Sequence, residues 1–313
     1  MTSLKKTNPV ILFDLNHNEM LDIEDNDFSD FSDLLHSLGL KINKNENKNL
    51  TDKILENIDI LIIGNPIDNY FSSIEIKEII NFVREGGRLI LISEYGSDYL
   101  QKTNLNDITE KNFGIFFHKN IVKEYNEINQ NCSSILSIQN FHRNQITSNN
   151  IREIIIGGAC SLFLNKNSKP LLFSNKAWTE AYSNSAEQWI KEGVEQQHSI
   201  AAYTEYGRGK VIAFGDIDIF TNDDNIGLNL RDNRKFILNS LNWLMEPVDN
   251  DDTMAWTLNQ MGTLAYEIKE MNNKINNIIE TMTILERRIS ALEELKYDAK
   301  IRNEVEEKEI SKF

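Results

Sequence analysis

The chain has 313 residues, a net charge of -15 and a pI of about 4.9. Such an acidic chain lacks the basic surface that nonspecific nucleic-acid binding needs, and an anionic membrane surface would repel it. Its two cysteines, Cys132 and Cys160, are too few for a disulfide framework and fit a reducing compartment. No apolar run reaches the ~18 residues of a membrane span, and residues 1–8 do not resemble a signal peptide. We therefore expect a cytoplasmic protein with no nucleic-acid partner and no direct membrane insertion.

The first hundred residues alternate short apolar runs with helical patterns. Strands are predicted at 10–13, 40–42, 58–63 and 88–92, and helices at 28–38, 50–56 and between 73 and 83. Ser72 or Ser73 is expected to cap the third helix, with Glu75 or Glu78 near its positive end. Strands and helices that alternate through short connections predict an α/β fold, with a mostly parallel sheet and helices on both faces.

The middle of the chain is less regular. We expect short strands at 113–117, 135–138, 154–156 and 171–173, the last two separated by a hairpin-like loop. Residues 178–193 are interpreted as a polar insertion that is partly helical. Residues 199–203 and 210–214 flank the turn sequence Tyr206-Gly-Arg-Gly209 and predict an antiparallel hairpin at one sheet edge. A last helix is predicted at 236–244.

The stretch from Gly209 to Phe220 combines a strand with charged residues. Its apolar run, 211–214, predicts a strand buried on both faces, and Asp216 and Asp218 follow directly. Ligands of open α/β sheets bind beyond the carboxyl ends of strands, so these aspartates could line a pocket. Alternatively, they cap the next turn by accepting backbone hydrogen bonds.

Three further loops should meet the aspartates at the same edge: 14–19, 64–68 and 93–97. The candidate pocket residues are Asp14, His17, Glu19, Asn65, Glu94, Asp216 and Asp218. Carboxylates and a histidine can hold a hard divalent cation or act as general acids and bases. The sequence lacks a metal-ligand spacing such as His-Glu-x-x-His, so we expect no metal and no cofactor.

No stretch carries the signature of a catalytic nucleophile. Ser93-Glu94-Tyr95-Gly96-Ser97 lacks the leading glycine of a nucleophile elbow, and Gly158-Ala159-Cys160-Ser161-Leu162 lacks the closing one. We interpret Cys160 as a small buried residue. A phosphate-binding loop is also missing, since Gly86-Gly87 precedes a strand and not a helix. We therefore expect a protein that is not an enzyme.

Beyond a break at 247–252, the pattern changes to a heptad repeat. The two seam rows comprise Met261, Leu264, Ile268, Met271, Ile275, Ile278, Met282, Leu285, Ile289 and Leu292. Such a narrow apolar seam predicts a coiled coil and favours a parallel dimer. A higher oligomer, a heterotypic partner helix and a helix folded back on the first domain remain alternatives. We expect two domains, an α/β domain at 1–248 and a coiled-coil helix at 249–313.

Several short motifs occur together in one order along the chain. They are Phe13-Asp-Leu-Asn-His-Asn-Glu19, Ile60-Leu-Ile-Ile-Gly64, Phe82-Val-Arg-Glu-Gly-Gly-Arg-Leu-Ile90, Asn112-Phe-Gly-Ile115, Gly157-Gly-Ala-Cys-Ser161, Gly209 to Phe220, and Asn242-Trp-Leu244. In these motifs the chain resembles the GIFT (gliding-motility/intraflagellar-transport fifty-two subunit) domain family, over about Val10 to Met245. The resemblance implies a flavodoxin-like, class I glutamine-amidotransferase-like fold that lacks the catalytic triad of that class. The tail departs from the family, because one heptad helix stands where further partner-binding segments would follow.

These observations together predict a non-enzymatic scaffold or protein-interaction protein. The GIFT-like domain would supply a recognition surface, and the coiled coil would assemble it with protein partners, as a homo-oligomer or a heteromer. The alternative is a hydrolase or small-molecule-binding domain that uses Asp14, His17, Glu94 and Asp216 at the strand ends.

Overall fold

The computed structural model describes two parts of the chain. They comprise residues 9–126, 131–142, 144, 146–147, 151–165 and 167–246, and in the tail residues 268, 271–272, 274–279, 281–283, 285–286 and 289. Internal contacts divide the chain into the units Met1–Asp249 and Asn250–Phe313.

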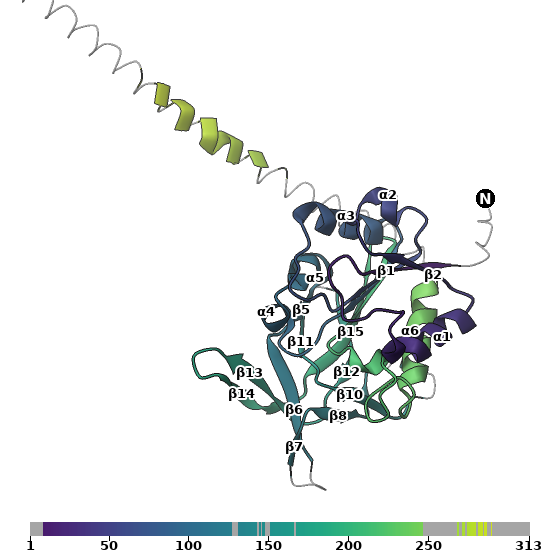
Figure 1. Ribbon diagram of the computed structural model, residues 1–313. Helices are drawn as coiled ribbons and strands as arrows, with labels where there is room; N and C mark the ends of the chain where they lie inside the picture. Colours follow the sequence, from purple (N-terminus) through teal and green to yellow (C-terminus); the bar gives the residue numbers. More distant parts are fainter. Residues whose placement is uncertain are drawn as a thin grey trace, which may run out of the picture. The chain divides into compact units, whose positions relative to one another are not determined.

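Five parallel strands form the centre of the first unit (Figure 1). Their order is β2 (Lys41–Asn45), β1 (Val10–Asp14), β3 (Ile60–Gly64), β4 (Arg88–Ile92) and β16 (Gly209–Phe214). The order 2-1-3-4, followed by one more parallel strand, is that of a flavodoxin-like sheet. Every residue of β3 and β16 is buried, and burial on both faces accounts for the apolar runs at 60–63 and 211–214. The predicted α/β class is therefore confirmed.

Helices cover both faces of this sheet. Alternate residues of each strand point to opposite faces, so that in β4 Ile90 and Ile92 join one core cluster and Leu89 and Leu91 the other. The first cluster includes side chains of α1 (Ser29–Ser37) and α6 (Asn233–Met245). The second includes side chains of α3 (Ser73–Arg84) and α5 (Leu105–Phe113). The short helices α2 (Asp52–Leu55) and α4 (Ser97–Gln101) lie in connections after β2 and β4.

Antiparallel strands extend the sheet beyond β16. First β15 (Ser199–Tyr206) pairs with β16, and then β11 (Leu162–Leu164) and β5 (Ile115–Phe117) follow. Two more strands, β12 (Lys169–Phe173) and β9 (Asn140–Phe141), branch from β15. Smaller sheets are formed by β8 (Ile135–Ile138) with β10 (Ile154–Gly157), and by β14 (Gln188–Gln196), β13 (Ala177–Ser183), β6 (Asn120–Asn126) and β7 (Asn131–Ser133).

Four sequence predictions for this region are wrong. The β15–β16 hairpin forms, but it lies inside the sheet between β4 and β11 and not at an edge. Residues 178–193 form most of the β13–β14 hairpin instead of a helix. The strands at 154–157 and 169–173 do not pair with each other, because β10 pairs with β8 and β12 with β15. The helix α5 lies where no regular element was predicted. The three errors in the strands share a cause, since long-range strand pairing does not appear in local periodicity.

The described residues of the tail are helical. Their seam side chains are half exposed, from 49% for Ile268 to 61% for Met271. Three predicted seam residues, Met261, Leu264 and Leu292, lie outside the described residues. Among the residues that the structure describes, no helix combines the length and hydrophobicity that crossing a membrane requires.

Candidate functional site

The loops at the carboxyl ends of β1, β3 and β4 meet, as predicted. The Met20 N–H donates to the Asn65 carbonyl oxygen at 3.1 Å, and the Asn65 N–H donates to that of Ile92 at 3.0 Å. The candidate side chains nevertheless form two clusters and not one. Asp14, His17 and Glu19 lie together, and Glu94, Asp216 and Asp218 lie together. Both clusters are at the carboxyl edge of the sheet, one after β1 and the other after β4 and β16.

Asn65 occupies the connection that follows the central strand β3. It is fully buried, its φ of 57° is left-handed, and its amide Nδ2 lies 2.8 Å from the Met20 Sδ. Its Oδ1 is buried without a hydrogen-bond partner. Because β3 separates β1 from β4 in the sheet, the side chains at the ends of those two strands remain apart.

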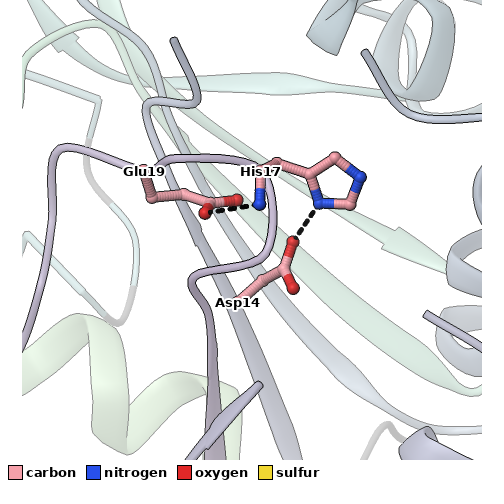
Figure 2. Close-up of side chains that lie close together, drawn as sticks. All are labelled: Asp14, His17 and Glu19. Carbon is pink, nitrogen blue, oxygen red and sulfur yellow. Dashed lines mark hydrogen bonds and ion pairs between the residues drawn. The ribbon is translucent and has the colours of Figure 1, made fainter. Parts of the chain in front are cut away.

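The first cluster comes from one short loop, Asp14 to Glu19. Figure 2 shows the Asp14 carboxyl group beside the His17 ring and the Glu19 carboxyl group beside the His17 backbone nitrogen. The His17 Nδ1 lies 2.6 Å from the Asp14 Oδ2, and the His17 backbone N–H donates to the Glu19 Oε2 at 3.2 Å. All three residues are at most 9% exposed.

Two more polar residues hold this cluster from outside. The Asn45 Nδ2 donates to the Asp14 Oδ1 at 2.7 Å, and the Glu75 Oε1 lies 3.3 Å from the His17 Nε2. The His17 ring also stacks on Phe71, with the ring centroids 3.8 Å apart. Glu75 belongs to the capping box with Ser72 that begins α3. The loop after β1 is thereby tied to β2 and to the first turn of α3.

The sequence analysis missed Asn45 and the second role of Glu75. Ser72-x-x-Glu75 has the spacing of a capping box, so the cap itself was predictable. The contact of Glu75 with His17 spans elements far apart in sequence, and no local signal predicts it. Asn45 is the last residue of β2, a strand that the sequence predicted to end at residue 42. It lies beside Asp14 because β1 and β2 pair in parallel.

Burial and crowding change the charges in this cluster. Burial, followed by repulsion from the Asp14 carboxylate and a hydrogen bond to it, raises the pKa of Glu19 to about 10. Burial would also raise the pKa of Glu75. Hydrogen bonds from Ser72 and the Leu50 N–H, together with the His17 ring, outweigh burial and lower the pKa of Glu75 below its ordinary value. Glu75 therefore keeps its negative charge to a lower pH than an isolated glutamate does.

In the second cluster, backbone donors already occupy most oxygens. The Asp216 Oδ1 and Oδ2 accept from the N–H groups of Asp218 and Ile219, at 3.0 and 3.3 Å. The Glu94 Oε1 and Oε2 accept from those of Tyr95 and Ile217, at 3.0 and 3.3 Å. Asp216 therefore caps the turn after β16. This is the second of the two interpretations that the sequence allowed for it.

The carboxyl groups of this cluster also raise one another's pKa. Burial, and then the charge of Asp216, raises the pKa of Glu94 well above its ordinary value. Burial, and then the charge of Asp218, raises the pKa of Asp216 well above its ordinary value. Burial and Asp223 raise the pKa of Asp218 to about 6. Gly158 allows the approach of Glu94, because a side chain there would meet the Glu94 Oε1 at 2.9 Å. The cluster is thus held together by backbone donors against charge repulsion.

The residues considered as nucleophiles are buried. Ser97 has a φ of 43° at the start of α4, is 1% exposed, and its Oγ has no hydrogen-bond partner. Cys160 is fully buried, and burial followed by the charge of Glu94 raises the pKa of its thiol. Neither side chain is arranged as an activated nucleophile, which needs exposure and a neighbouring base.

Two cavities in the described part of the first unit lie away from both clusters. One, of 860 Å³, lies beside the amino ends of β3 and β4 and is lined by residues that include Asp59, Phe82 and Arg88. Another, of 620 Å³, is lined by residues that include Phe141 and Gln197. None of the seven candidate residues lines either cavity.

Solved structures share this arrangement of strands and helices. The chain is similar in fold to the mmIFT52 N-terminal domain. That match has a TM-score of 0.61 and 17% sequence identity, and it covers 75% of this chain and 97% of the other. Cytoplasmic protein STM1381 from Salmonella typhimurium LT2 has a TM-score of 0.50 at 12% identity, over 76% of this chain and 100% of the other. A putative thua-like protein from Bacteroides uniformis has a TM-score of 0.46 at 12% identity, over 78% and 95% of the two chains.

Sequence comparison adds no relative to these. No protein-family model matches the chain, and no curated protein matches it. The fold that the GIFT resemblance implied is confirmed by the similarity to the mmIFT52 N-terminal domain. Identities this low concern the fold alone, so activity and partners have to be argued from the residues of this chain.

Proposed function

We propose that this protein is a non-enzymatic assembly protein whose tail pairs with the tail of a second copy as a parallel coiled coil. The observation that carries the proposal is the row of half-exposed apolar side chains along the described tail helix. Its members are Ile268, Met271, Ile275, Ile278, Met282, Leu285 and Ile289, each between 49% and 61% exposed. They follow one another in steps of three and four residues, which places them on one stripe.

Pairing would stabilise a helix that has little support of its own. Isolated helices are marginal in water, and most helical stability in proteins comes from packing of the apolar face. Burying the exposed half of an Ile, Leu or Met side chain contributes on the order of 1 kcal/mol. Ile268, Ile275 and Ile289 occupy one seam row and Leu285 the other, a distribution that favours two parallel strands. Ile279, beside the seam and 55% exposed, would widen the interface.

Two features of the α/β unit support a role in recognition and not in catalysis. Ser97 and Cys160 lie in the places where an elbow was sought, and both are buried. The polar clusters at the carboxyl edge line neither described cavity. A small-molecule-binding or hydrolytic domain remains the second candidate, favoured by the convergence of Asp14, His17 and Glu19.

Oligomeric state tests the proposal directly. Light scattering on the full chain at micromolar concentration should give the mass of a dimer. Replacing Ile275 and Leu285 with Asp places charges in the seam, whose desolvation association cannot offset, so this variant should be monomeric. Asn276→Asp with Thr283→Asp adds the same charge on the outer face of the helix, away from the seam, and should remain dimeric.

Other masses would argue against the proposal. A monomeric wild-type chain would mean that the helix folds back or binds another protein. A control variant that dissociates as fully as the seam variant would show that charge and not the seam controls association.

A further inference from the structure

Each side chain of the Asp14–His17–Glu19 cluster has one polar atom held by a fixed partner. Asn45 holds the Asp14 Oδ1 at 2.7 Å, Glu75 lies 3.3 Å from the His17 Nε2, and the His17 N–H holds the Glu19 Oε2 at 3.2 Å. The remaining atoms are Asp14 Oδ2, His17 Nδ1 and Glu19 Oε1. The first two lie 2.6 Å from each other, and the Glu19 Oε1 has no hydrogen-bond partner. One ligating atom from each residue lies within 4.8 Å of the others.

In this arrangement the Glu19 Oε1 is the atom that has no hydrogen-bond partner. It is buried, no donor reaches it, and Glu19 as a whole is 9% exposed. The carboxylate beside it, Asp14, is another acceptor, so the two groups cannot satisfy each other without a positive species between them. A buried carboxylate oxygen without a partner is strongly unfavourable. A cation, a proton or a water molecule that donates a hydrogen bond would offset this cost.

We propose that Asp14, His17 and Glu19 bind one divalent transition-metal cation of the Zn²⁺ type. An imidazole nitrogen with two carboxylate oxygens is a donor set that suits Zn²⁺, whereas Mg²⁺ and Ca²⁺ prefer oxygen alone. The outer contacts match those of metal sites. A ligating histidine usually donates its other ring N–H to a carboxylate, as His17 can to Glu75, and ligating carboxylates are themselves hydrogen-bonded, as Asp14 is by Asn45.

A small movement of the loop would admit the ion. Two ligands about 2.1 Å from a tetrahedral zinc ion lie roughly 3.4 Å apart, so Asp14 and His17 must separate from their present 2.6 Å. The loop alternates buried and exposed residues: Asn18 and Met20, which flank Glu19, are both exposed, Met20 by 45%. The buried residues His17 and Glu19 are therefore each next in sequence to an exposed residue. Three protein ligands would leave a coordination position for water or a further ligand.

The second acidic cluster lacks these properties. Both oxygens of Glu94 and both of Asp216 already accept backbone hydrogen bonds. A cation there would have to compete with these donors, and no histidine belongs to the cluster. Glu94→Gln therefore serves as a matched control, since it removes one buried carboxylate outside the proposed site.

Calorimetric titration of the full, metal-stripped chain with Zn²⁺ tests the proposal. The wild-type chain and Glu94→Gln should each bind one ion per chain with a Kd of about 1 µM or tighter. Glu19→Gln and Asp14→Asn, which preserve size, should weaken binding by at least ~100-fold. Zinc at about 100 times the Kd should raise the Tm of the wild type by roughly 5–10 °C and leave that of Glu19→Gln unchanged.

Three outcomes would overturn the proposal. The first is a wild-type chain that binds no Zn²⁺ when the ion is supplied at 100 times the expected Kd of about 1 µM. The position beside Glu19 would then belong to a proton or a water molecule. The second is equal affinity in the wild type and Glu19→Gln when metal-free melting shows both folded. The third is displacement of Zn²⁺ by millimolar Mg²⁺, which would exclude the His17 nitrogen as a ligand. None of these outcomes depends on the oligomeric state of the tail.

Discussion

At the scale of single residues, the three carboxyl groups of Glu94, Asp216 and Asp218 are held together against their mutual repulsion. Backbone donors fix Glu94 and Asp216, whereas Asp218 lies at the end of the cluster and is only partly buried. Its pKa rises from 3.8 to about 6, because burial and the neighbouring charge of Asp223 disfavour its ionised form. The folded protein therefore retains this proton longer than the unfolded chain does.

Replacing Asp218 with Asn should stabilise the protein in a pH-dependent way. Between pH 3.8 and about 6 the folded state binds more protons at this position, so the wild type loses stability as the pH rises through that window. After discounting for solvent screening, the loss above this window is about 1 kcal/mol. The variant should melt about 2–4 °C above the wild type at pH 8 and at the same temperature near pH 4.

Thermal melting at the two pH values measures the effect of Asp218→Asn. Asp224→Asn, which removes the same charge at an exposed neighbouring position, should leave the melting temperature unchanged at both values. If Asp218→Asn lowered the melting temperature at pH 8, Asp218 would be a structural acceptor and not a source of repulsion.

At the scale of elements, the β15–β16 hairpin decides how the parallel strands connect to the antiparallel ones. Its turn packs against the carboxyl end of α3, where the Arg208 N–H donates to the Arg84 carbonyl oxygen at 3.0 Å. Gly209 begins β16 at the point of closest approach. A methyl group there would collide with the carbonyl oxygens of Val83 and Gly87. The strand can therefore reach its place beside β4 only with glycine at this position.

Gly209→Ala should destabilise the first unit by roughly 1–3 kcal/mol, because backbone atoms cannot move aside as a side chain can. The expected decrease in melting temperature is about 2–4 °C per kcal/mol. Gly39→Ala is the comparison: its φ of 71° is left-handed but its surroundings are open, so it should cost only about 1 kcal/mol. Equal losses in the two variants would show that the collision at Gly209 is relieved without cost.

At the scale of the whole molecule, the first unit has a closed set of packing partners. Both hydrophobic clusters consist of residues between Ile11 and Met245, and they fill the two faces of one sheet. The residues of the second unit that are described are exposed along the seam. The packing that stabilises the first unit is therefore contained within that unit.

A fragment of residues 1–250 should fold by itself. It should melt cooperatively, within about 2 °C of the full chain carrying the Ile275 and Leu285 substitutions, because both lack the paired tail. Circular dichroism and light scattering would show a folded monomer. An aggregated or noncooperative fragment would mean that the tail contributes to the fold of the first unit.

The sequence by itself determined the regular part of the fold. Short apolar runs located β1, β3, β4 and β16, since these strands are buried on both faces and leave a continuous apolar signal. It also identified all members of both polar clusters, because strand ends of a parallel sheet share an edge. It predicted the heptad seam of the tail, whose pairing stays a prediction.

Only the tertiary structure decided how these parts combine. It placed β15 and β16 inside the sheet, and it divided the acidic and histidine candidates into two clusters, because β3 separates β1 from β4. It also brought Asn45 and Glu75 to Asp14 and His17, which makes a metal site arguable where the spacing of residues 14–19 alone did not. Strand pairing and side-chain convergence join residues that are distant in sequence, so local patterns of hydrophobicity carry no record of them.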